Sequence, residues 1–137
     1  MIIDAKNIIL GRLASFAAKQ ALLGEKIDII NCNDVVIVGK KKLILERYKR
    51  KASMGTPIKG PFFSLTSERF VKRTIRGMLP HKQYHGRIVF KKIKCYKDIP
   101  EALKNKEITK LDKFNIYQTQ NLNFLKVSDV CKYLKGK

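Results

Sequence analysis

The residues best suited to bind a ligand form one stretch of a single charge sign, from Arg69 to Lys97. It holds ten Lys or Arg residues and no Asp or Glu in 29 positions. A solvated helix face usually mixes both signs, so a run of this length indicates a polyanionic partner rather than a solubilising surface. The phosphate backbone of a nucleic acid has the matching density of negative charge.

The first part of this stretch has the pattern of a helix with two faces. Four apolar residues recur at the spacing of one helix face: Val71, Ile75, Met78 and Leu79. Four basic residues recur at the spacing of a second face: Arg69, Lys72, Arg73 and Arg76. Thr66 and Ser67 suit the start of the helix, and Pro80 marks its end because proline disfavours helix in the residue before it. The pattern predicts a helix that packs on a core and presents guanidinium groups outward.

Two histidines follow this helix, but they do not predict a metal site. His81 and His85 are four positions apart, and no nearby acid or cysteine completes a zinc ligand set. Pro80 and Gly86 favour a basic turn over residues 81–86 rather than a helix. We therefore expect no bound metal, and we expect these histidines either to contact RNA or to be exposed at the surface.

The sequence VIVGKKK, residues 36–42, is the best candidate for binding a single phosphate group. An apolar strand leads through Gly39 into a predicted helix start, where backbone N–H groups can meet an anion. The chain lacks both G-x-x-x-x-G-K-[ST] and G-x-G-x-x-G, so an enzyme that uses a nucleotide is weakly supported. No Ser or Cys nucleophile with a base and no carboxylate pair stands out. We expect no enzyme activity, cofactor or small-molecule substrate.

Aromatic side chains within basic stretches can stack on unpaired bases. Three tyrosines fit this description: Tyr48, Tyr84 and Tyr96. Tyr84 is the best candidate for stacking. A structural role, in which Tyr84 packs within a loop, agrees equally well with the sequence. The chain shows no aromatic platform of the kind found in RNA-recognition motifs.

The elements that must position these residues alternate between strand and helix. Four segments have strand character: residues 1–6, 26–33, 35–38 and 93–96. Three segments have helical character in addition to the basic helix: residues 11–24, 40–51 and the end of the chain from 128. The run VVIV at 35–38 fits a strand covered on both faces. The alternation predicts an α/β class: a three-layer α/β/α domain with a central, mostly parallel sheet of about four strands.

We expect residues 1–137 to form a single domain. Two Gly and two Pro mark a basic loop at about 52–61, and Phe62 and Phe63 are expected to anchor its end in the core. From about residue 101 the pattern is less regular.

The net charge of the whole chain is also consistent with a polyanionic partner. Thirty Lys and Arg against eleven Asp and Glu give a net charge of +19, whose self-repulsion a polyanion would relieve. RNA, DNA and an anionic membrane surface all fit this charge. No segment approaches 18 apolar residues and no helix has bulky apolar residues to expose, so we expect no membrane association. The N-terminus lacks the pattern of a signal peptide. Three separated cysteines, Cys32, Cys95 and Cys131, indicate reduced thiols in a cytoplasmic protein.

Three segments of the sequence resemble the large-subunit ribosomal protein L13 family, in its archaeal and eukaryotic branch. They are GRLASFAAKQALLG at residues 11–24, KRKASMGTPIKGPFF at 49–63 and RTIRGMLPHK at 73–82. The third is the most specific, and the resemblance covers about residues 1–100. It implies a compact α/β/α domain with a central parallel sheet, bound to large-subunit ribosomal RNA and beside other large-subunit proteins, with no catalysis and no cofactor. It places four residues of the most specific segment at the RNA, namely Arg76, Pro80, His81 and Lys82, together with Arg73, which leads into them.

Charge and resemblance together predict a structural, RNA-binding component of the large ribosomal subunit, located on cytoplasmic ribosomes. The alternative is a regulatory RNA- or DNA-binding module that acts off the ribosome. The residues expected at the RNA are Lys40, Lys41, Lys42, Arg47, Lys49, Arg50, Lys51, Lys59, Arg69, Lys72, Arg73, Arg76, His81, Lys82, Arg87, Lys91 and Lys92. Such contacts position and stabilise folded RNA more than they read its sequence.

Overall fold

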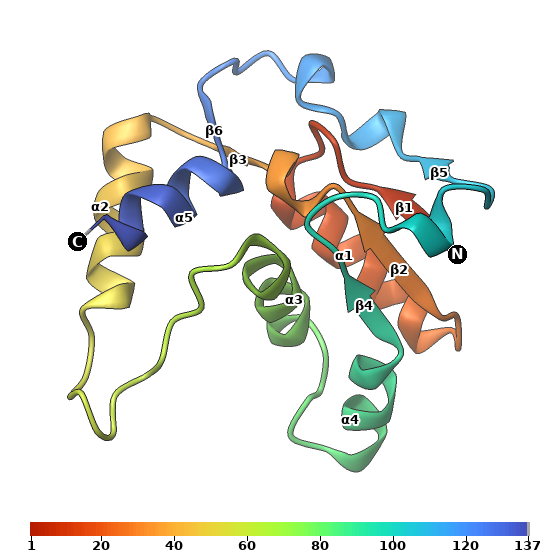
Figure 1. The fold of residues 1–137 in the computed structure, drawn as a ribbon, viewed down its shortest axis with the longest axis horizontal. Helices are drawn as coiled ribbons and strands as arrows, with labels where there is room; N and C mark the ends of the chain where they lie inside the picture. Colours follow the sequence, from red (N-terminus) through yellow and green to blue (C-terminus); the bar gives the residue numbers. More distant parts are fainter. Residues whose placement is uncertain (137) are drawn as a thin grey trace.

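Short segments rich in isoleucine form the central sheet of the protein. The structure is a computed structural model that describes residues 1–136, and its main sheet is parallel with the strand order β4-β2-β1-β5 (Figure 1). The four strands are β1 (Ile2–Asp4), β2 (Ile27–Ile30), β4 (Ile93–Cys95) and β5 (Thr109–Lys110). In the central pair Ile3 lies opposite Ile29, and in the next pair Ile27 lies opposite Ile93. The predicted α/β class with a four-stranded, mostly parallel sheet is confirmed.

One face of this sheet carries the main hydrophobic core. Four fully buried isoleucines belong to this core: Ile3, Ile27, Ile29 and Ile93. Helix α1 (Leu10–Leu22) and helix α3 (Ser67–Gly77) contribute to the same core and contact each other. The small side chains of Ala14, Ala17 and Ala21 are completely buried, so α1 lies close to its neighbours. The alanine pattern of residues 11–24 therefore predicts the observed packing.

The second face of the sheet has a thin covering layer. Because side chains alternate along a strand, Ile2 and Ile30 point away from the main core. They pack with Leu103 of the 3₁₀ turn η2 (Glu101–Leu103), and with the half-buried Tyr96 and Ile108. The segment after residue 96 thus forms the outer layer on this face.

The strand predicted at 35–38 lies outside the central sheet. Strand β3 (Val36–Val38) pairs antiparallel with β6 (Phe124–Lys126), and the two form a separate small sheet. Of the four residues 35–38, Val35 and Val36 are fully buried, whereas Ile37 and Val38 are half-buried. The expectation of a strand covered on both faces is therefore wrong. Helices α2 (Lys41–Ala52) and α5 (Val127–Lys135) contact each other and β6.

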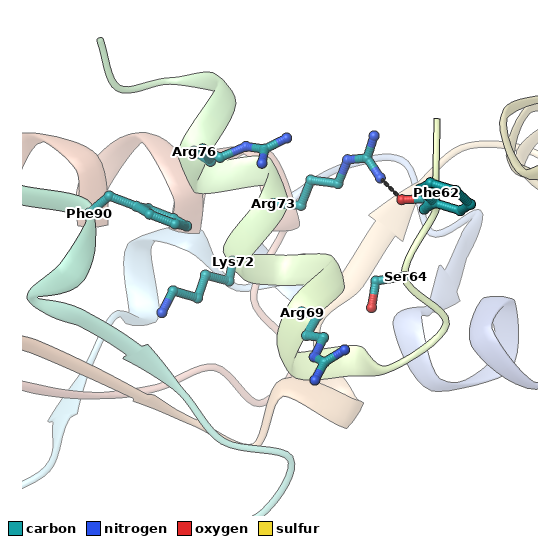
Figure 2. Close-up of a pocket in the computed structure, with 7 residues that line it drawn as sticks. All are labelled: Phe62, Ser64, Arg69, Lys72, Arg73, Arg76 and Phe90. Atoms are coloured by element: carbon teal, nitrogen blue, oxygen red, sulfur yellow. Dashed lines mark hydrogen bonds between the residues drawn. The ribbon is translucent and has the colours of Figure 1, made fainter. Parts of the chain in front are cut away.

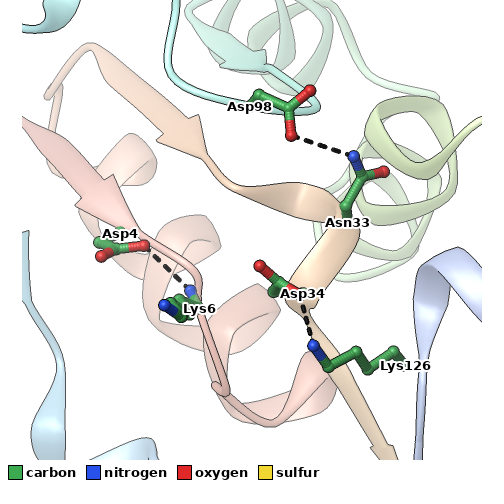
Figure 3. A network of polar contacts seen from close by, with 6 residues as sticks. All are labelled: Asp4, Lys6, Asn33, Asp34, Asp98 and Lys126. Carbon is green, nitrogen blue, oxygen red and sulfur yellow. Dashed lines mark hydrogen bonds and ion pairs between the residues drawn. The ribbon is translucent and has the colours of Figure 1, made fainter.

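Acidic side chains hold the loops at the carboxyl ends of the parallel strands (Figure 3). Asp34 forms an ion pair with Lys126, with 2.7 Å between Oδ1 and Nζ, and so ties β6 to the loop after β2. The side-chain amide of Asn33 donates to Asp98 over 3.2 Å, and the backbone N–H of Lys6 donates to Asp4 over 3.0 Å. These acids stabilise the scaffold and lie outside the basic stretch.

Helix α4 (Tyr84–Lys91) occupies part of the segment that was expected to be a turn. The turn prediction for residues 81–86 is correct up to Gln83 and wrong for Tyr84, His85 and Gly86, which are helical. Gly86 was taken as a helix breaker, but here the missing Cβ lets the helix pack against the Pro80 carbonyl. Within residues 1–136, no helix combines the length and apolar character needed to span a membrane.

Candidate nucleic-acid interface

Helix α3 has the two faces that its sequence predicts, with one exception. Phe70, Val71 and Ile75 are buried in the main core, as is Leu79 just after the helix. The four basic side chains lie on the other side, where Arg69 and Arg76 are exposed and Lys72 and Arg73 are half-buried. Met78, expected to face inward, is 44% exposed because the helix ends at Gly77 and the chain turns away.

A cavity of about 440 Å³ lies over the basic face of α3 (Figure 2). Its lining residues are Phe62, Ser64, Arg69, Lys72, Arg73, Arg76 and Phe90. The guanidinium group of Arg73 donates to the Phe62 carbonyl over 2.8 Å, which fixes the end of the loop beside the helix. The lining therefore combines four cations with two phenylalanines and no acidic residue. Figure 2 shows the Phe62 carbonyl directed toward Arg73, with the Phe62 ring at the outer edge of the cavity.

The expected anchoring role of the two phenylalanines holds for only one of them. Phe63 packs against Tyr48 and Phe70, with ring centroids 6.0 and 5.6 Å away. Phe62 is 72% exposed at the edge of the cavity. Neighbouring residues in an extended segment point in opposite directions, so only one of the pair can reach the core.

Aromatic rings also lie beside the charged ends of two basic side chains. The Arg73 guanidinium lies 5.3 Å from the centre of the Phe63 ring, and the Lys72 ammonium lies 5.0 Å from the centre of the Phe90 ring. Such contacts restrict the side chains while leaving their charges available. The cations of α3 are thus partly preorganised.

Helix α2 extends the basic surface beside α3. Arg47 and Lys51 of α2 and Arg73 of α3 line a second cavity of about 310 Å³. Desolvation, followed by the nearby charges of Arg47 and Arg73, lowers the pKa of Lys51. Arg47, Lys51 and Arg73 thus form a group of positive charges with no acidic residue in the same cavity. Such a group suits the binding of phosphate.

None of the cations on α2, α3 or α4 forms an ion pair with a carboxylate of residues 1–136. Among residues 1–136 the one ion pair joins Lys126 of β6 and Asp34 of the loop after β2, neither of which belongs to these helices. Glu46 and Glu68 lie on α2 and α3 but form no ion pair with the basic residues described here. The positive field of this surface is therefore not cancelled within the described chain.

The turn after α3 is fixed against α4 by two contacts. The Arg87 guanidinium donates to the Lys82 carbonyl over 3.1 Å, and Gly86 packs directly on the Pro80 carbonyl. His81 is half-buried, with its Nδ1 atom 3.4 Å from the Leu79 carbonyl. Residues 80–83 therefore form a rigid extension of the basic face.

Substitution of Gly86 by alanine should disrupt this turn. The new Cβ would overlap the Pro80 carbonyl and lie 3.0 Å from the His81 nitrogen, both of which are backbone atoms with little room to move. We expect a loss of about 1–3 kcal/mol in the free energy of unfolding, as for other overpacked sites. Urea unfolding of the G86A protein measures this. The matched control is Gly77→Ala, because no atom lies within 4 Å of a Cβ at that position. Equal stability of G86A and wild type would contradict the close packing.

The other predicted site residues lie at several places around these helices. Lys40 is the N-cap residue of α2, and Lys41 and Lys42 lie in its first turn, shortly after β3 in the chain. Arg47, Lys49, Arg50 and Lys51 lie in its second half, and Lys59 is exposed in the loop that follows. Arg87 and Lys91 lie on α4, and Lys92 follows its end. The second cavity thus brings Arg73 of α3 together with Arg47 and Lys51 of α2, whereas Lys40–Lys42 line neither of the two cavities.

The sequence did not identify the aromatic walls of the cavity. The sequence predicts Phe62 in the core beside Phe63, and no local signal marks Phe62 or Phe90 as part of a site. Among the tyrosines, Tyr48 packs on Phe70 with a centroid distance of 5.0 Å, and burial raises its pKa. Tyr48 is therefore a packing residue. Tyr84 is 79% exposed at the start of α4, so it stays available for stacking.

Two of the three cysteines, Cys32 and Cys131, have the environment of unreactive thiols. A hydrogen bond with Cys95 and burial raise the pKa of Cys32, and burial raises the pKa of Cys131. Thiols of raised pKa are poor nucleophiles because the thiolate is the reactive form. Within residues 1–136, no three His, Cys, Asp or Glu side chains lie close enough together to hold a metal ion.

Comparisons with known proteins agree on one family. A family model described as ribosomal protein L13 matches residues 1–102. A large ribosomal subunit protein uL13 from Archaeoglobus fulgidus is 38% identical over 97% of this chain and 86% of its own length. Proteins of the same name from Picrophilus torridus and Methanopyrus kandleri are 36% and 42% identical. These matches cover 96% and 78% of this chain, and 94% and 67% of the relatives.

Proposed function

The chain belongs to the ribosomal protein L13 family, and from this membership we propose that it is a structural component of the large ribosomal subunit that binds and stabilises ribosomal RNA. It is a structural protein and not an enzyme. Its place is on the ribosome beside other large-subunit proteins, and we propose that these ribosomes are cytoplasmic. We also propose that the whole chain is one domain, because Val127, Val130 and Leu134 of α5 pack into the same core as α1 and α3.

We place the RNA on the surface formed by α3, the second half of α2 and the turn at 80–83. The observation that carries this proposal is the set of cations with no carboxylate partner in the described chain, held by a rigid core and by ring contacts. Arginine suits the role because its planar guanidinium group can bridge two phosphate oxygens. The remaining predicted residues, including Lys40–Lys42, Lys59 and Lys91–Lys92, are proposed to reach neighbouring RNA segments.

The alternative phosphate site at Gly39 has less support. The Gly39 backbone N–H donates to the Asn123 carbonyl over 2.8 Å, so it is already satisfied within the protein. The carboxyl ends of the parallel strands, where α/β proteins usually bind nucleotides, are occupied by hydrogen bonds of Asp4, Asp34 and Asp98. Neither place favours a nucleotide-using enzyme.

The dependence of binding on salt tests the proposed surface. If six side chains around the two cavities reach phosphates, the logarithm of the affinity should fall against the logarithm of salt concentration with a slope of about −4 to −5. The six side chains are Arg47, Lys51, Arg69, Lys72, Arg73 and Arg76. Filter binding of the purified protein to large-subunit ribosomal RNA measures the slope. A slope near zero would contradict binding through phosphates.

Substitution of Arg76 by alanine should weaken RNA binding without affecting folding. Arg76 is exposed on α3, and loss of one phosphate contact should lower the affinity roughly fivefold at 0.15 M salt and make the slope about one unit less negative. Filter binding measures both quantities, and the melting temperature of the free protein serves as the control. A large fall in that melting temperature would mean that the faces of α3 are reversed.

A further inference from the structure

The Phe62 ring is an exposed aromatic surface with no role in packing. It is 72% exposed, whereas the adjacent Phe63 is packed between Tyr48 and Phe70. Within residues 1–136, no second ring and no cation lies over Phe62. Its ring faces are therefore free to meet a ligand, unlike Phe90, which carries the Lys72 ammonium 5.0 Å from its centre.

The backbone at Phe62 is held in place from two directions. The Arg73 guanidinium donates to the Phe62 carbonyl over 2.8 Å, and the next residue is inserted into the core (Figure 2). A ring on such a segment is preorganised, so stacking on it costs little ordering of the loop.

The surroundings of the ring define the chemistry of that partner. The cavity has about 440 Å³, within the usual range of roughly 300–1,000 Å³ for small-ligand sites, and its charged residues are all cations. A flat apolar group and a neighbouring anion would both be satisfied there, and a nucleotide unit supplies both. In an A-form duplex the bases are stacked inside the helix, so a duplex can offer only its phosphates and sugars to this site.

We propose that the cavity on α3 binds an unpaired segment of RNA, with one base stacked on Phe62 and the adjacent phosphates on Arg69, Arg73 and Arg76. This inference rests on the proposed RNA-binding function and specifies the form of RNA taken by this part of the surface. Stacking tolerates any base because each base has a flat π face, so the site selects unpaired nucleotides rather than a sequence.

Two substitutions of Phe62 test the stacking contact. Phe62→Leu keeps an apolar side chain but removes the ring, and Phe62→Trp enlarges the ring. The chain contains no tryptophan, so F62W introduces a single fluorescent reporter at the site. The probes are a ten-nucleotide oligoadenylate and a 16-base-pair RNA duplex. We expect F62L to bind the oligoadenylate about 5- to 150-fold more weakly, and to bind the duplex within twofold of wild type. We expect F62W to keep its affinity and to lose fluorescence when the oligoadenylate binds.

A third variant separates this proposal from the proposed function. Arg69→Gln removes one cation of the cavity and should weaken binding of both probes. If R69Q weakens both probes while F62L affects them equally and F62W fluorescence does not change, the stacking assignment is wrong and the RNA-binding surface stands. If R69Q alters neither probe, both the surface and the stacking assignment are wrong.

Discussion

Replacing Ile75 with alanine should destabilise the free protein by about 2–5 kcal/mol, the range for large-to-small substitutions in a core. Ile75 is completely buried on the side of α3 that contacts α1 and β4. The loss is a large part of the 5–15 kcal/mol that holds a typical domain folded. Urea unfolding, monitored by circular dichroism, measures this loss. If the unfolding free energy depends on urea concentration with the same slope in both proteins, the shift in the midpoint concentration gives the change in free energy.

Met78→Ala is the matched control for this substitution. The sequence assigns both residues to one apolar face, whereas the structure leaves Met78 44% exposed. We therefore expect M78A to cost clearly less than I75A. Equal effects of the two substitutions would mean that α3 is rotated or extended relative to the structure described here.

Reversing two charges on α3 should have the largest effect on RNA binding. In the R69E/R76E double variant we expect a fall in affinity for large-subunit ribosomal RNA on the order of a hundredfold at 0.15 M salt. Each lost phosphate contact costs roughly fivefold, and each new carboxylate repels a phosphate. Both side chains are exposed and outside the core, so the melting temperature of the free protein should stay close to the wild-type value. Filter binding measures the affinity.

The control for this experiment must carry the same change in total charge. Lys104→Glu together with Lys106→Glu also lowers the net charge by four units. Both lysines are exposed next to η2, beside the opposite face of the sheet. We expect the control to lose far less affinity than R69E/R76E. Equal losses would show that the protein attracts RNA through its total charge and not through the α3 surface.

The parts of the molecule that the sequence predicts correctly are those set by local pattern. Helix α3 is one example, because burial of Val71 and Ile75 and exposure of Arg69 and Arg76 follow from the helical period. The alanines of α1 are another, because small residues at helical spacing permit close packing. The all-basic character of residues 69–97 likewise needs no tertiary information to indicate a polyanionic partner.

The parts that the sequence does not predict depend on contacts between distant segments. Strand β3 leaves the central sheet because β6, about 90 residues later, pairs with it, and nothing near Val36–Val38 indicates this. Helix α4 includes Gly86 because that glycine packs on Pro80, a tertiary requirement that outweighs low helix propensity. Phe62 is exposed and Phe63 is packed in the core because the loop contacts Tyr48 through Phe63 and Arg73 through the Phe62 carbonyl. The aromatic part of the candidate site could therefore not be found from the sequence.

The most direct test of the central claim is sedimentation of the tagged protein from cell lysate through a sucrose gradient, repeated at rising salt. A structural component of the large subunit should travel with that subunit and remain bound at moderate salt, because many phosphate contacts dissociate together only at high ionic strength. A protein that stays at the top of the gradient at low salt would contradict this account. The leading explanation would then be a regulatory RNA- or DNA-binding module that acts off the ribosome.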